Sequence, residues 1–136
     1  MDTQKPTSSI KSLGEVALRV SDMNKSVEFY QNIVGLKPMS LSDTAAFFYI
    51  AEGVEGHTQI LALFDRNREL TPFASTLDHI AFTISLNDFE AEVNRLESLN
   101  VELSFAEHKW VQWRSLYFRD PDHNLIEFVC FDNQIH

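Results

Sequence analysis

A nine-residue stretch near the start of the chain returns about half a chain later. Residues 13–21 and 77–85 share leucine, alanine and serine at their first, fifth and ninth positions, and apolar residues match at the fourth, sixth and eighth. Such a repeat is typical of two copies of one small unit that together build a shared core. We therefore expect two related modules with a cavity between them. The copies differ most in chemistry at their third position, where Glu15 corresponds to His79.

The first module shows the pattern of a strand, a helix and two further strands. The predicted elements cover residues 15–20, 23–34, 45–51 and 58–64. Ser21 or Asp22 is suited to cap the start of the helix, and Gly35 is suited to end it. The acidic, glycine-containing residues 52–56 are expected to form the loop between the last two strands.

The second module repeats this order. The predicted elements are a strand, a helix and three strands, at residues 79–85, 88–99, 101–106, 111–119 and 125–131. Asn100 is expected to end the helix. Together the modules predict an α+β fold with about eight strands and two helices.

The chain divides into a leader and one compact domain. The predicted parts are a disordered leader at 1–12 and a single domain at 13–136, with module one at 13–65, a linker at 66–76 and module two at 77–132. A chain of 136 residues is long enough to bury a substantial core. The leader lacks the apolar centre of a signal peptide, which favours a cytoplasmic location.

Composition excludes several classes of partner. The net charge of −9 argues against nucleic acid and anionic membranes, because both bind to basic surfaces. No run of about 20 apolar residues predicts a membrane span. Cys130 is the only cysteine, so the chain forms no internal disulfide and no thiolate metal cluster.

Each strand has two different faces, because side chains alternate across a strand. One face is bulky and suited to packing, and the other holds the candidate ligands. In the first strand Val16, Leu18 and Val20 form a bulky face, and Glu15 lies on the opposite, smaller one. Ile80, Phe82 and Ile84 repeat that bulky face opposite His79. In the last strand Glu127 lies in an apolar row, where a buried carboxylate needs a partner. The alternative to a metal site is a purely structural role for these residues. Glu15 would then form a salt bridge with an arginine, and His79 would form a hydrogen bond with a backbone carbonyl.

Three motifs, in order, resemble the vicinal oxygen chelate superfamily, which includes glyoxalase I, bleomycin resistance proteins and extradiol dioxygenases. The motifs are residues 13–22 with Phe29-Tyr30 and Gly35-Leu36, residues 77–82, and residues 117–128. The similarity covers residues 13–132. It implies two tandem βαβββ modules that form a cup-shaped mixed sheet, glyoxalase/dioxygenase-like, around a divalent metal ion.

The resemblance also implies a ligand set. The family's ligands fall on the first and last strands of each module, here at Glu15, His79 and Glu127. The fourth position falls on Ile60 or Leu61, which are aliphatic, with Gln59 as a substitute if the register slips. Two carboxylates and an imidazole suit Fe(II) or Mn(II), with Mg, Ni or Zn as alternatives.

Three ligands with open positions for substrate make the site most like that of an extradiol ring-cleaving dioxygenase. His108, Tyr117, Asp120-Pro121 and Glu127 follow the extradiol signature, although Ala106 and His123 depart from it. Tyr117 and His108 are the implied catalytic residues, which would bind the substrate or move a proton. A solvated loop histidine is the alternative for His108.

Two other functions stay open at this point. They are a glyoxalase- or epimerase-type lyase or isomerase, and a metal-free protein that binds a small molecule for resistance. Trp110 and Trp113 would form an aromatic wall of the cavity or fill the core. The expected partner is a small-molecule substrate, and the resemblance implies a homodimer, with the cup built within one chain or across two.

Overall fold

The computed structural model describes residues 12–54, 57–66, 77 and 79–136. The chain forms two compact units, unit 1 (Met1–Leu70) and unit 2 (Thr71–His136), which we describe separately. The boundary falls inside the predicted linker. The linker from residue 67 to 76 and the leader up to residue 11 lie outside the described residues, and the single domain at 13–136 stays a prediction.

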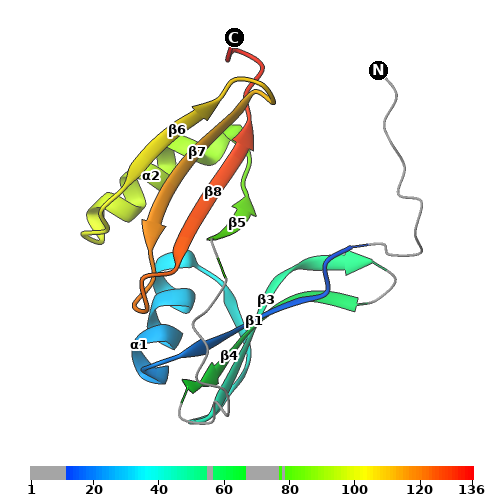
Figure 1. Ribbon diagram of the computed structural model, residues 1–136, viewed down its shortest axis with the longest axis vertical. Coiled ribbons are helices and arrows are strands. Elements are labelled where there is room, and N and C mark those ends of the chain that lie inside the picture. The colour runs from blue at the N-terminus through cyan, green and yellow to red at the C-terminus, as the bar shows by residue number, and fades with distance from the viewer. Residues whose placement is uncertain (1–11, 55–56, 67–76, 78) are drawn as a thin grey trace. The chain divides into compact units, whose positions relative to one another are not determined.

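Unit 1 contains a four-stranded mixed sheet (Figure 1). Its elements are β1 (Glu15–Val20), α1 (Met23–Glu28), η1 (Phe29–Val34), β2 (Lys37–Leu41), β3 (Ala45–Val54) and β4 (His57–Asp65). The strand order is β1-β4-β3-β2, with β1 parallel to β4 and the other pairs antiparallel.

Unit 2 has the same topology. Its elements are β5 (His79–Thr83), η3 (Leu86–Asp88), α2 (Phe89–Ser98), β6 (Ser104–His108), β7 (Trp113–Arg119) and β8 (Leu125–Phe131). The strand order is β5-β8-β7-β6, again with one parallel and two antiparallel pairs. Figure 1 shows α2 along one face of this sheet. The two βαβββ modules of the predicted α+β fold are confirmed.

The predicted helix starts and stops are also confirmed. Asp22 caps α1, because its Oδ1 accepts a hydrogen bond of 3.0 Å from the backbone N–H of Lys25. Gly35 ends the helical segment at a φ of 93°, and Asn100 follows α2 at a φ of 62°. One feature differs from expectation: the second half of the first helix, η1, is π-helical.

Two local predictions in unit 1 are wrong. The sequence pattern gave no strand at β2, because this edge strand contains Pro38 and its residues are mostly exposed, so it lacks an apolar signature. The predicted loop at 52–56 is wrong for residues 52–54, which belong to β3, and residues 55–56 lie outside the described residues. β4 begins at His57, which pairs with Val54.

The bulky strand faces form the cores of the two units, as predicted. Leu18, Val20 and Ile80 are buried, whereas Glu15 and His79 on the opposite faces are exposed. The largest fully buried apolar side chains are Tyr30, Phe48, Leu61, Leu63, Val20, Leu96, Leu116, Phe118, Ile126 and Cys130. Within the described part of the chain, no helix has the length and apolar character needed to span a membrane.

Candidate metal centre

Strand pairing in unit 2 gathers polar side chains on the sheet face opposite the core. Glu127 on β8 has Ala81 of β5 and Tyr117 of β7 as its Cα partners. Side chains of paired residues point to the same face, and so do those of residues two apart on one strand. We call this surface the Glu127 face, and it carries His79, Ser115, Tyr117, His108 and Glu127.

Glu127 is a buried carboxylate with hydrogen-bond partners. Its exposed fraction is 6%. Its Oε2 accepts a hydrogen bond of 2.5 Å from the hydroxyl of Ser115 and one of 3.2 Å from the hydroxyl of Tyr117. The sequence argument that this carboxylate needs a partner is thereby confirmed. Ser115 was not among the predicted site residues, although its position two residues before Tyr117 on the same strand could have revealed it.

His79 lies beside the other oxygen of Glu127. Its Nε2 is 3.3 Å from Glu127 Oε1, and the side chain of His79 is 40% exposed. Two ligand atoms at about 2.1 Å from one octahedral cation lie about 3 Å from each other. The pair therefore has nearly the spacing of two ligands of a single metal ion, and an imidazole with a carboxylate is a common donor set for divalent metals.

His108 and Tyr117 form a second contact on this face. His108 is the last residue of β6 rather than part of a loop, and its Nε2 lies 2.9 Å from the Tyr117 hydroxyl oxygen. The same nitrogen is 3.9 Å from Glu127 Oε2. Burial raises the pKa of Tyr117, and the negative charge of Glu127 contributes in the same direction. Tyr117 therefore keeps its proton near neutral pH.

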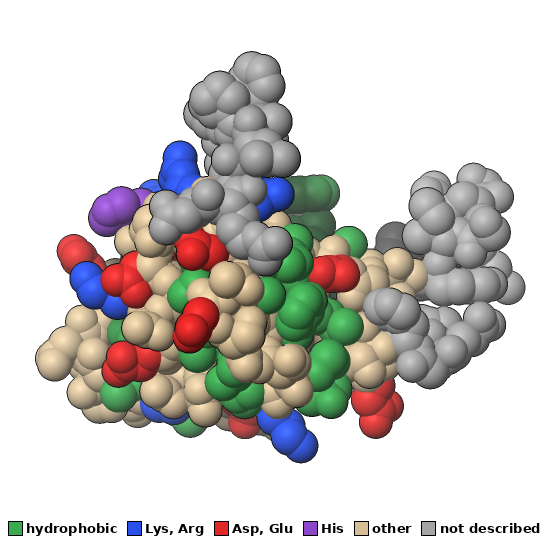
Figure 2. All heavy atoms as spheres, turned by 90° about the horizontal axis from the view of Figure 1, so that it is seen from below, with side chains coloured by type: hydrophobic (Ala, Val, Ile, Leu, Met, Phe, Trp, Pro, Cys, Tyr) green, Lys and Arg blue, Asp and Glu red, His purple; other side chains and the backbone are tan. Residues whose placement is uncertain are grey.

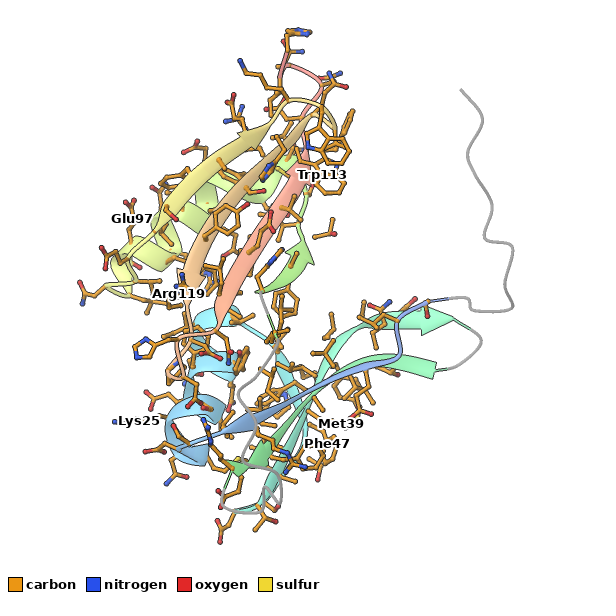
Figure 3. The ribbon with its side chains drawn as sticks, viewed as in Figure 1. Lys25, Met39, Phe47, Glu97, Trp113 and Arg119 are labelled. Carbon is orange, nitrogen blue, oxygen red and sulfur yellow. The ribbon has the colours of Figure 1, made fainter. Side chains whose placement is uncertain are left out.

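An aromatic row lies at one end of the Glu127 face. His108, Trp113 and Phe131 are Cα partners across β6, β7 and β8. Figure 3 shows Trp113 and Arg119 at the two ends of β7. Trp113 is 44% exposed and Trp110, in the turn before β7, is 85% exposed. Neither tryptophan fills the core of unit 2, and Trp113 is placed to contact a ligand on this face.

Glu15 lies in unit 1, at the exposed start of β1. The pairing of this sheet also identifies the counterpart of Glu127. In unit 2, Glu127 pairs with the residue two positions after His79, and in unit 1 the residue two positions after Glu15, Ala17, pairs with Ala62. The fourth ligand position is thus Ala62 rather than Ile60, Leu61 or Gln59. It remains aliphatic, as expected.

Unit 2 by itself offers two ligands. Among the described residues, no group of three or more histidine, cysteine, aspartate or glutamate side chains converges where it could hold a metal ion. The charge of the surface is predominantly acidic, in line with the net charge of −9. Figure 2 shows acidic side chains spread over one face, with basic ones scattered between them. This net negative charge argues against nucleic acid, which binds to basic surfaces.

The curated relatives of the chain include two kinds of transferase. Metallothiol transferase FosB of Staphylococcus haemolyticus is 31% identical over 119 residues, which cover 87% of this chain and 82% of that protein. Glutathione transferase FosA of Serratia marcescens is 32% identical over 119 residues, which cover 87% of this chain and 79% of that protein. Neither name denotes an extradiol dioxygenase, the activity that the sequence motifs favoured.

Solved structures show the same fold. A glyoxalase/dioxygenase from Nostoc punctiforme superposes with a TM-score of 0.75 at 22% identity, covering 98% of this chain and 99% of that one. A second structure is a mutant of the fosfomycin resistance protein FosX of Listeria monocytogenes, complexed with Mn(II) and 1S,2S-dihydroxypropylphosphonic acid. It superposes with a TM-score of 0.68 at 27% identity, covering 92% of this chain and 94% of that one. The family model described as Glyoxalase/Bleomycin resistance protein/Dioxygenase superfamily matches residues 12–128. The chain therefore belongs to this superfamily, the vicinal oxygen chelate proteins.

Proposed function

We propose that this chain is a divalent-metal-dependent enzyme that transfers a thiol to a small, oxygen-rich substrate of the fosfomycin type. The observation that carries the proposal is the His79–Glu127 pair, whose facing atoms are 3.3 Å apart. The names of the FosB and FosA relatives denote thiol transfer, and the FosX structure holds Mn(II) with a phosphonate that has two neighbouring hydroxyls. Support for the third ligand, Glu15, comes from the family resemblance.

The metal ion, when bound, would polarise a substrate oxygen as a Lewis acid. Glu127 and His79 would hold it, with Mn(II) or Fe(II) as the expected ion. In the transfer, the thiol loses its proton and its sulfur forms a bond to a carbon of the three-membered ether ring of fosfomycin. The bond between that carbon and the ring oxygen breaks, and the oxygen takes up a proton. The Nε2 of His108 and the hydroxyl oxygen of Tyr117 are 2.9 Å apart, beside the carboxylate of Glu127. These two side chains form a path along which that proton reaches the substrate.

The direct test is a product assay. Protein purified without chelators would be incubated with Mn(II), fosfomycin and glutathione, and the product would be analysed by mass spectrometry. We expect an adduct whose mass is the sum of both reactants, absent with Glu127→Gln. If Mn(II) binds but no adduct forms with glutathione or other low-molecular-weight thiols, thiol transfer is wrong.

Extradiol ring cleavage is the second candidate. The observation that favours it is the hydrogen-bonded pair His108–Tyr117 on the face that carries Trp113 and Glu127. Fe(II)-loaded protein would then consume oxygen on addition of a catechol and release a coloured ring-opened product. A lyase or isomerase would instead act on 1,2-dicarbonyl adducts without oxygen. A metal-free binding protein would quench its tryptophans with a ligand while binding neither Fe(II) nor Mn(II).

Assembly and location are part of the proposal. We expect a homodimer, as in two-module members of the family, and a cytoplasmic protein that acts on a small molecule. Light scattering on the purified chain measures its mass in solution, for which the monomer value is 15.7 kDa. A mass near this value at micromolar concentration would contradict the dimer.

A further inference from the structure

Ser115 makes a short hydrogen bond on the Glu127 face. Its side chain is fully buried in the middle of β7, and its hydroxyl donates to Glu127 Oε2 at 2.5 Å. Hydroxyl–carboxylate bonds of about 2.5–2.7 Å are charge-assisted and stronger than those between neutral groups. The contact therefore restrains the orientation of the carboxylate.

The remaining contacts divide the two oxygens of Glu127 by role. Tyr117 donates its single hydroxyl proton to Oε2 at 3.2 Å, so in this arrangement His108 Nε2–H donates to the tyrosine oxygen at 2.9 Å. Oε2 thus accepts from two hydroxyls. Oε1 faces His79 Nε2 at 3.3 Å. One oxygen is held by the protein and the other is directed to the candidate metal position.

Unit 1 shows that the fold does not require a hydroxyl at this position. Ser115 pairs with Val129, two residues beyond Glu127, and Ala45 pairs in the same way with Phe64, two residues beyond Ala62. Ala45 is thus the counterpart of Ser115 in a sheet of the same topology. Burying the Ser115 hydroxyl carries a desolvation cost, and its short hydrogen bond to Glu127 offsets that cost.

We propose that Ser115 is a positioning residue that holds Oε2 of Glu127, so that a divalent metal is bound by Oε1 alone. The inference rests on the proposed metal-dependent function and deepens it, because it assigns the coordination mode of one ligand and the residue that sets it. Supporting residues of this kind change metal affinity by about 10–100-fold when they are removed.

The test is Mn(II) affinity, measured by calorimetry or by water-proton relaxation. Ser115→Ala is expected to raise the Kd for Mn(II) by about 10-fold or more. Ser26→Ala is the matched control, because Ser26 is also fully buried and its hydroxyl has no hydrogen-bond partner among the described residues. Its Kd should equal that of the wild type. An unchanged Kd in Ser115→Ala, with tight binding by the wild type, would overturn the inference and leave the metal site standing.

A second pair of variants keeps the inference testable if the alanine variant folds poorly. Ser115→Thr and Ser115→Val have the same shape, but only threonine retains the hydroxyl. We expect Ser115→Thr to bind Mn(II) about 10-fold more tightly than Ser115→Val, and equal affinities would contradict the proposal. A crystal structure with Mn(II) bound to both oxygens of Glu127 would also overturn it. No Mn(II) binding by the wild type would refute the proposed function, and this inference with it.

Discussion

Corresponding positions of unit 1 and unit 2 can be compared residue by residue, because the two sheets pair their strands in the same way. Ser115, Tyr117 and Glu127 form the polar cluster of unit 2. Their counterparts in unit 1 are Ala45, Phe47 and Ala62. Figure 3 labels Phe47 on the sheet of unit 1. The sheet of unit 2 thus has a carboxylate and two hydroxyls at positions where the sheet of unit 1 has apolar side chains.

The faces that pack against the helices do not differ in this way. Phe48 of β3 and Phe118 of β7 are counterparts, because they pair with Leu61 and Ile126 next to the positions compared above, and all four are buried. The repeat is therefore maintained on the core faces, where packing requires apolar side chains, and has diverged on the opposite faces. Function in this chain is a property of those opposite faces.

The largest expected effect on metal binding comes from removing the carboxylate that distinguishes unit 2. Glu127→Gln should weaken Mn(II) binding by more than roughly 100-fold, because the change removes a ligand rather than a supporting group. The wild type should gain about 2.7 kcal/mol in free energy of unfolding at a Mn(II) concentration of 100 times its Kd. Thermal denaturation of both proteins with Mn(II) and with chelator measures this difference.

The chelator condition serves as the control for that experiment. Without metal, Glu127→Gln should unfold at or above the wild-type temperature, because it replaces a buried charge by a neutral amide. If Mn(II) stabilises the variant as much as the wild type, the metal does not bind at Glu127.

Placing the carboxylate in unit 1 tests the comparison from the other side. Ala62 is fully buried, and its neighbours Ala45 and Phe47 offer no hydroxyl. Ala62→Glu should therefore lower the free energy of unfolding by about 3–5 kcal/mol, the cost of an uncompensated buried charge. Urea denaturation at neutral pH measures the loss.

Two further variants isolate the cause of this loss. Ala62→Gln has the same size without the charge and should lose less. Adding Ala45→Ser and Phe47→Tyr to Ala62→Glu should restore part of the stability, because the pair copies the hydroxyls of unit 2. If the triple variant is no more stable than Ala62→Glu, hydroxyl donors do not explain why unit 2 tolerates its carboxylate.

Much of this comparison could be predicted from the sequence. The repeat, the bulky faces around Leu18 and Ile80 and the helix ends at Gly35 and Asn100 all follow from local periodicity and turn chemistry. Edge strand β2 could not be predicted, because an exposed edge needs no alternating apolar pattern.

The candidate site was predicted less completely than the fold. Glu127 stood out as a carboxylate in an apolar row, which is a signal within one strand. The contact of Ser115 with Glu127 depends on the register between β7 and β8, which joins residues 12 apart in the chain. For the same reason, the sequence did not identify Ala62 as the fourth ligand position. Cross-strand register is set by tertiary packing, and short sequence windows do not encode it.

A smaller effect is expected from the tyrosine that differs between the units. Tyr117→Phe removes one of the two hydroxyl donors to Glu127 and should raise the Kd for Mn(II) by about 10-fold. The mirror change, Phe47→Tyr, adds a hydroxyl where no carboxylate accepts it, and should leave the affinity unchanged. Parallel titrations measure both, and equal effects of the two changes would contradict the assignment of the site to unit 2.

A last difference concerns stability alone, at the ends of the two helical segments. Gly35 and Asn100 both have left-handed backbones, at φ values of 93° and 62°. Gly35→Ala should cost about 1–2 kcal/mol through backbone strain alone, because a Cβ at this position meets no atom of the described residues within 4 Å. Asn100→Ala should cost less, since alanine replaces a residue that already has a Cβ in this conformation.

Urea denaturation distinguishes these losses, and Asn100→Gly is the control. Glycine adopts the left-handed conformation without strain, so this variant should be at least as stable as the wild type. A loss in Asn100→Gly comparable to that in Gly35→Ala would mean that the Asn100 side chain, rather than its backbone conformation, stabilises the end of α2. The two units would then differ in how they end their helices as well as in the chemistry of their sheets.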